Sequence, residues 1–144
     1  LKGNRVSRNQ IMAIKEESVT DQKNSLTVCL DNILRHAGIT RNTEYDLAQG
    51  KTAIQILEEN MTGVQVLDLS GCSLDAVLYY VNQDIPVLAI LEDGEAVLVT
   101  GFNEFNVVIM EPSTGKLYKK GMNDATTWFA ENGNHFISYM KIDN

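Results

Sequence analysis

The chain has 144 residues and a formal net charge of −7, with 19 acidic and 12 basic side chains. This length predicts a single domain. The acidic balance argues against a nucleic-acid binder, because contacts with phosphates depend on Lys and Arg, and against docking on anionic lipid. Two cysteines and two histidines form no disulfide framework and fit no zinc-finger spacing, so we expect neither a metal nor a cofactor.

The first half of the chain predicts mainly helices. Residues 1–20 fit no motif and are interpreted as an N-terminal arm, and a polar loop follows at 20–25. Apolar residues recur on one face over 26–36 and again over 52–59, which indicates two helices. A third helix opens at Ser73, a residue type that caps helices, and a short strand at 64–67 precedes it.

The second half predicts strands separated by short turns, with one late helix. The predicted elements are strands at 86–91, 96–99, 107–110 and 116–118, a helix at 123–131 and a final strand at 135–142. No apolar run approaches the roughly 18 residues of a membrane span, so we expect no direct membrane insertion. The order predicts one α+β domain over 1–144, with a mainly helical part at 21–84 and an antiparallel sheet part at 85–144.

Cys29 is the most informative single residue. It lies in the first turn or two of a predicted helix, and the partial positive charge of a helix N-terminus lowers the pKa of a thiol. Such a position is typical of cysteine nucleophiles. The alternative is a small core residue, because free cysteines are among the most buried residue types. Cys72 is interpreted as a packing or capping residue, and a bridge between the two cysteines stays open.

A nucleophilic cysteine usually needs a histidine as its base, and the candidates are His36 and His135. His36 follows Cys29 by seven positions on the same helix, roughly 10 Å away at about 1.5 Å per residue, which is too far for a hydrogen bond. His135 opens the last strand, and nothing in the sequence places it beside Cys29. Both are interpreted as surface or edge residues, and His135 stays an alternative base.

A series of motifs occurs in a characteristic order from Gln22 onward. Gln22 stands in the loop before Cys29-Leu30, and the helix that follows ends at Gly38. Apolar segments come next at 85–89 and 96–102, and then a turn at 112–115 and a closing strand at 134–139. This order resembles the papain-like peptidase domains of the bacteriocin-processing, double-glycine type. The resemblance implies a papain-like cysteine peptidase fold, in which N-terminal helices pack on an antiparallel sheet.

The resemblance also implies where the catalytic residues would lie. Cys29 matches the nucleophile of the family, and Gln22 matches its oxyanion-hole glutamine at a spacing one residue longer than usual. The position of the family's histidine is Glu95 here, and that of its aspartate is Glu111. A carboxylate near a thiol raises the thiol pKa and disfavours the thiolate. We therefore expect a degenerate relative whose cleft binds a peptide or protein segment.

Two other functions stay open at this point. One is an active cysteine peptidase that uses Cys29 with a rearranged base, either His135 or Glu95. The other is a structural module of a larger cell-surface protein, since the chain opens on polar residues without an initiating Met. The same opening and the resemblance favour an extracytoplasmic or membrane-attached location in a bacterium. The sequence leaves the oligomeric state open.

Overall fold

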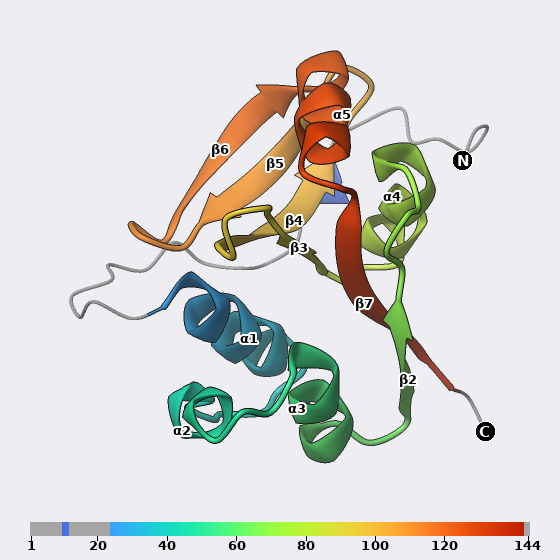
Figure 1. Ribbon diagram of the computed structural model, residues 1–144. Coiled ribbons are helices and arrows are strands. Elements are labelled where there is room, and N and C mark those ends of the chain that lie inside the picture. The colour runs from blue at the N-terminus through green and yellow to red at the C-terminus, as the bar shows by residue number, and fades with distance from the viewer. Residues whose placement is uncertain (1–9, 12–23, 143–144) are drawn as a thin grey trace.

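The computed structural model describes residues 10–11 and 24–142, and they form one antiparallel sheet with helices on both of its faces (Figure 1). The strands are β1 (Gln10–Ile11), β2 (Val64–Asp68), β3 (Val87–Ile90), β4 (Ala96–Phe102), β5 (Asn106–Glu111), β6 (Lys116–Gly121) and β7 (His135–Lys141). The helices are α1 (Ser25–His36), α2 (Glu44–Ala48), α3 (Ala53–Asn60), α4 (Leu74–Asn82) and α5 (Met122–Glu131).

The sheet has the strand order β2-β7-β3-β4-β5-β6, and β1 pairs with β4 beside this path. Strands β3 to β6 form a meander, because each pairs antiparallel with the next along the chain. The last strand, β7, returns to lie between β2 and β3, so that Leu88 of β3 faces Leu98 on one side and Ile137 on the other. The first and last described strands, β1 and β7, therefore belong to the same sheet.

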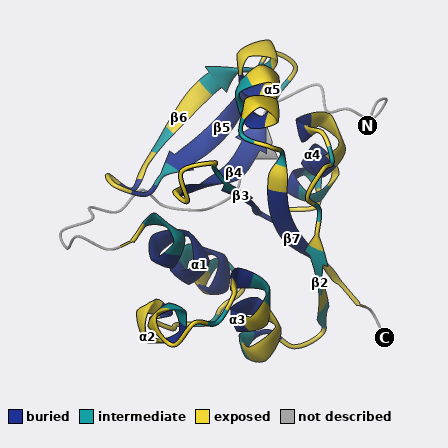
Figure 2. Cartoon of the chain, in the orientation of Figure 1, coloured by how far each residue is buried: buried dark blue, intermediate teal, exposed yellow. Residues whose placement is uncertain are grey.

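The central strands β3, β4, β5 and β7 are buried on both faces (Figure 2), whereas β6 is largely exposed. Successive side chains of a strand point to opposite faces of the sheet. In β3, Leu88 packs into a cluster with α1 and α3, whereas Val87 and Ala89 pack into a second cluster with α4 and α5. In β4, Leu98 and Val97 divide between the clusters in the same way. This arrangement explains the almost uninterrupted apolar runs of the central strands.

The architecture confirms the α+β class and the prediction of helices packed on an antiparallel sheet. The predicted helices and strands of residues 26–142 all form, although β4 and β6 continue beyond their predicted ends. Helix α2 was not predicted, since it is only five residues long. Its position depends on the buried carboxylate of Asp46, which pairs with Arg41 at 2.8 Å. None of the helices in the described ranges is long and apolar enough to cross a membrane.

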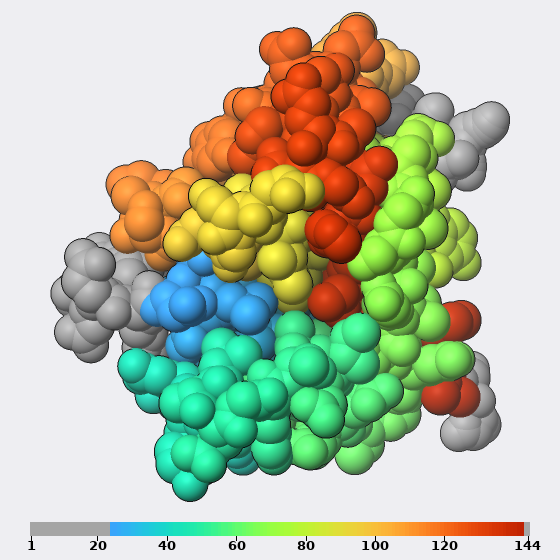
Figure 3. Space-filling model, in the orientation of Figure 1, coloured from blue at the N-terminus to red at the C-terminus, as the bar shows by residue number. Residues whose placement is uncertain are grey.

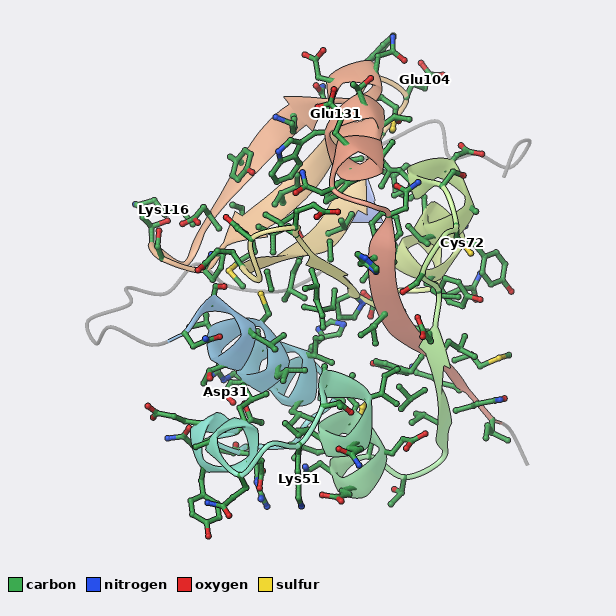
Figure 4. The ribbon with its side chains drawn as sticks, viewed as in Figure 1. Asp31, Lys51, Cys72, Glu104, Lys116 and Glu131 are labelled. Carbon is green, nitrogen blue, oxygen red and sulfur yellow. The ribbon has the colours of Figure 1, made fainter. Side chains whose placement is uncertain are left out.

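The two cysteines are both free and lie on opposite faces of the sheet. Cys29 belongs to the cluster beneath α1, whereas Cys72 packs against the cluster beneath α4 (Figure 4). Because the sheet stands between them, no bridge joins Cys29 and Cys72 in this fold. The sequence left a bridge between Cys29 and Cys72 open, and the structure has both thiols free.

Candidate functional site

Helix α1 begins one residue earlier than its apolar pattern predicts. Asn24 is its N-cap, and the Asn24 side chain accepts a hydrogen bond of 2.7 Å from the backbone N–H of Leu26. Ser25 is therefore the first residue of the helix, and Cys29 lies one full turn further in. The hydroxyl of Ser25, rather than the thiol of Cys29, therefore lies at the N-terminus of the helix.

Ser25 joins this helix end to the sheet. Its hydroxyl oxygen accepts a hydrogen bond of 2.8 Å from the backbone N–H of Ala96, the first residue of β4. Figure 3 shows the turn between β3 and β4, in yellow, directly above α1, in blue. The bond therefore closes one side of a hollow between the start of α1 and the β3–β4 turn.

A pocket of about 450 Å³ opens at this junction, and we call it the Ser25 pocket. Its walls come from the start of α1, the β3–β4 turn, the end of β5 with the following turn, β6 and α5. The lining residues are Asn24, Ser25, Leu91, Asp93, Glu95, Ala96, Val97, Glu111, Pro112, Ser113, Tyr118 and Trp128. This volume lies within the usual range of ligand sites.

Glu95 lies at the exposed rim of the Ser25 pocket. Its backbone is held in the β3–β4 turn, where its N–H donates to the Asp93 carboxylate at 2.9 Å and its carbonyl accepts from Leu91 at 2.7 Å. The side chain is thus positioned on a short turn of defined geometry. It places a carboxylate at the rim of the pocket.

Glu111 ends β5 and also lines the Ser25 pocket. One of its carboxylate oxygens accepts from the backbone N–H of Ser113 at 2.9 Å and from that of Thr114 at 3.3 Å. The Ser113 hydroxyl donates to the same oxygen. The Glu111 carboxylate is therefore engaged in holding the β5–β6 turn.

Cys29 is completely buried, at 0% exposure, and does not belong to the lining of the Ser25 pocket. Burial raises the pKa of the Cys29 thiol well above its ordinary value, and the nearby Glu111 carboxylate raises this pKa further. The helix N-terminus lies a turn away, and its effect falls off within the first turn. The thiol is held in its neutral form, which is a poor nucleophile.

The other predicted site residues lie apart from this group. His135 is exposed at the start of β7, where its Nδ1 lies 3.4 Å from the hydroxyl oxygen of Ser70, and it does not line the Ser25 pocket. His36 lies at the far end of α1, and its Nε2 donates to the carbonyl oxygen of Asp84 at 3.0 Å. Gln22 lies outside the described residues.

The structure thus brings Glu95 and Glu111 together with Ser25 in the lining of one pocket. Cys29 is buried near Glu111 but does not line that pocket, and neither does His135. Ser25 is the residue that the sequence reasoning missed. The available signal was the pair Asn24-Ser25, because Asn is a preferred N-cap and the residue after the cap is the first of the helix. Among the described lining residues none is a histidine or a cysteine. Among all the described residues, no group of three or more His, Cys, Asp or Glu side chains is arranged to hold a metal ion.

One solved structure resembles this chain over nearly its whole length. It is the crystal structure of a “putative C39-like peptidase” from Bacillus anthracis. The two chains superpose with a TM-score of 0.74 at 14% sequence identity, and the match covers 93% of this chain and 98% of the other. The sequence matches no protein-family profile and no curated protein. At this level of identity the likeness establishes the fold, so this chain has a C39-like peptidase fold.

Proposed function

We propose that this chain is a C39-like peptidase domain that has lost the catalytic machinery and binds a peptide or protein segment in the Ser25 pocket. The observation that carries the proposal is the chemistry of that pocket. It combines one hydroxyl at a helix start with the carboxylates of Glu95 and Glu111. Its described lining offers neither a thiol nor an imidazole.

The geometry argues against covalent catalysis at this site. A catalytic nucleophile needs a base within hydrogen-bond reach that can take its proton. The Ser25 hydroxyl accepts from Ala96 and donates to no side chain in the described part of the protein. The Glu111 carboxylate is engaged with Ser113 and Thr114. The Cys29 thiol is buried and lies outside the pocket.

The charge and shape of the Ser25 pocket favour a particular kind of peptide. Three carboxylates line it, from Asp93, Glu95 and Glu111, and no Lys or Arg is among the described lining residues. Tyr118 and Trp128 add aromatic surface, and Lys120 covers one face of the Trp128 ring at 4.9 Å from its centroid. A segment with a basic side chain next to an apolar one would complement these walls.

The proposal is tested with a peptide selected from a random displayed library and then synthesised with a fluorescent label. The label's anisotropy gives the Kd for the wild type and two variants. Glu95→Trp places a bulky ring at the pocket mouth, whereas Glu104→Trp is a matched control in the β4–β5 turn (Figure 4). We expect Glu95→Trp to raise the Kd at least tenfold and Glu104→Trp to leave it unchanged. Mass spectrometry should find the peptide intact after prolonged incubation.

Three results would contradict the proposal. Equal affinity of Glu95→Trp and the wild type would show that the peptide binds elsewhere. Cleavage of the peptide by the wild type, lost in Ser25→Ala or in Cys29→Ala, would instead support an active peptidase. Failure to select any peptide would favour the structural module as the function.

A further inference from the structure

A second and larger cavity lies at the other end of α1 and is also lined by residues after α3 and by the β2–β7 strand pair. Figure 1 shows the arrangement of these elements. Its volume is about 590 Å³. The lining residues are His36, Ala37, Ile39, Met61, Thr62, Gly63, Val64, Asp84, Tyr139, Lys141 and Ile142. It shares no residue with the Ser25 pocket, and we call it the Tyr139 cavity. The proposed peptide-binding function does not use it.

Tyr139 is a buried residue whose polar end has no partner. Its side chain lines the cavity, its exposure is only 3%, and its hydroxyl makes no hydrogen bond with any described residue. Asn134 Oδ1 is the one fully buried side-chain atom of the described residues without a partner. The Tyr139 hydroxyl oxygen is not among such fully buried atoms, so it keeps a small accessible surface. Tyr139 lines the cavity, which gives a ligand access to this residue. An unpaired hydroxyl in a ligand-sized cavity is a donor available to a ligand.

The Tyr139 hydroxyl remains a donor over the whole neutral pH range. Burial raises the pKa of Tyr139, and the Asp84 carboxylate raises this pKa further. A protonated phenol donates to an acceptor such as a carboxylate oxygen and cannot itself repel an anion. The group that best satisfies this donor is therefore an anionic acceptor.

Lys141 adds a positive charge to the same wall. Across the β2–β7 ladder Tyr139 faces Val66 and Lys141 faces Val64, so both side chains point to the same face of the sheet. Lys141 forms no ion pair with any described residue. Asp84 is the carboxylate of the lining, but its side chain is 61% exposed and lies 3.6 Å from His36 Nε2. The carboxylate of Asp84 is therefore largely solvated, whereas the ammonium group of Lys141 has no ion-pair partner among the described residues.

Four apolar side chains contribute to the remaining walls of the cavity. Ile39 and Met61 come from the segments after α1 and α3. Val64 is the first residue of β2, and Ile142 is the residue after β7. Ile142 is 52% exposed although it is aliphatic. Burial of such surface under an apolar ligand is favourable, at about 25 cal/mol per Å².

We propose that the Tyr139 cavity binds a small organic carboxylate with an apolar tail. The ligand's carboxylate accepts a hydrogen bond from the Tyr139 hydroxyl and lies near the ammonium group of Lys141. The tail lies against Ile39, Met61 and Ile142. Binding at this cavity is independent of the Ser25 pocket, so a ligand in one leaves the other open.

The experiment uses octanoate and octanol, which share an alkyl chain and differ in the head group. Each is titrated into isotope-labelled protein while the backbone amide resonances are followed. We expect octanoate to shift the resonances of Ile39, Thr62 and Tyr139, and octanol to bind at least tenfold more weakly. Tyr139→Phe keeps the ring and should weaken octanoate binding about tenfold, as expected for a lost hydrogen bond to a charged group. It should leave octanol binding unchanged.

Tyr79→Phe is the matched control, because Tyr79 is 52% exposed on α4 and lies outside the cavity lining. It should bind octanoate like the wild type. Lys141→Gln should also weaken the binding of octanoate, because it removes the positive charge from the cavity wall. The proposal is overturned if octanoate and octanol bind equally, if the shifts lie outside the cavity, or if Tyr139→Phe binds octanoate as tightly as Tyr79→Phe. A second readout is the unfolding temperature, which octanoate should raise more in the wild type than in Tyr139→Phe at the same concentration.

Discussion

The hydroxyl oxygen of Ser25 accepts a hydrogen bond of 2.8 Å from the backbone N–H of Ala96, and the two residues are 71 positions apart in the sequence. This contact ties the start of α1 to the start of β4 at the wall of the Ser25 pocket. Ala96 is buried, and the Ser25 oxygen is the partner that the structure gives its backbone N–H. The bond therefore stabilises both the fold and the shape of the pocket.

Removing the Ser25 hydroxyl should destabilise the protein. In Ser25→Ala the Ala96 N–H loses its partner, which should lower the free energy of unfolding by about 1–3 kcal/mol. Ser25→Thr keeps a hydroxyl oxygen and should cost less than half as much. Urea unfolding of the three proteins measures both values. Equal losses in the two variants would show that the hydrogen bond is not the source of the effect.

Hydrophobic periodicity in the sequence predicts the helix that carries this site but not the residue at which the helix begins. Hydrophobic periodicity identified α1 and its buried face, including Cys29 and Ile33, because burial repeats with the helical turn. The same periodicity cannot locate a helix start to within one residue. The cap geometry at Asn24 makes the partly buried Ser25 the first residue of the helix and places Cys29 in the core.

Long-range pairing is the other limit of the sequence reasoning. Local turn signals predicted the β3–β6 meander, since each of its hairpins closes within a few residues. No local signal places β7 between β2 and β3, or Ser25 beside Ala96, because those contacts join distant segments. The matched positions Glu95 and Glu111 were predicted from the family resemblance, and they do line one pocket. Their chemical roles stay predictions.

The two cysteines should differ in their reactivity. In the native protein at pH 8, iodoacetamide should modify Cys72, which is partly exposed, and leave the buried Cys29 unmodified. Peptide mass spectrometry identifies the modified residue. Cys72→Ser should take up no label when native and one label in urea. Labelling of Cys29 at the rate of Cys72 in the native state would show that its thiol is reachable and would favour the peptidase function.

The Glu111 carboxylate should be required for the β5–β6 turn. Glu111→Ala removes the acceptor for the backbone N–H groups of Ser113 and Thr114. We expect a loss of about 1–2 kcal/mol in the free energy of unfolding. Glu111→Gln keeps one side-chain oxygen and should lose less than Glu111→Ala. If Glu111→Ala unfolds at the wild-type urea concentration, these contacts contribute nothing to stability.

The raised pKa of the Cys29 thiol predicts that alkaline pH destabilises the protein through this residue. An unfolded cysteine ionises at about pH 8.5, whereas the buried Cys29 keeps its proton because its folded pKa lies well above that value. The folded state thus binds more protons above pH 8.5, so the free energy of unfolding falls as the pH rises. Below that pH the contribution of Cys29 is fully present.

Cys29→Ala isolates this effect from the other titrating groups. At pH 7 the variant should be less stable than the wild type by about 1 kcal/mol, because a packed core side chain is truncated. At pH 10 the difference should shift by about 2 kcal/mol in favour of the variant, which corresponds to roughly 1.5 pH units above the unfolded thiol pKa at about 1.36 kcal/mol per unit. The sign should therefore reverse, and Cys29→Ala should be the more stable protein at pH 10. Tyr118 and Tyr139 also have raised pKa values, but both proteins contain them, so their contributions cancel in the difference. Urea unfolding under reducing conditions at the two pH values measures this difference. A difference that stays constant from pH 7 to pH 10 would mean that Cys29 ionises as readily in the folded state as in the unfolded one.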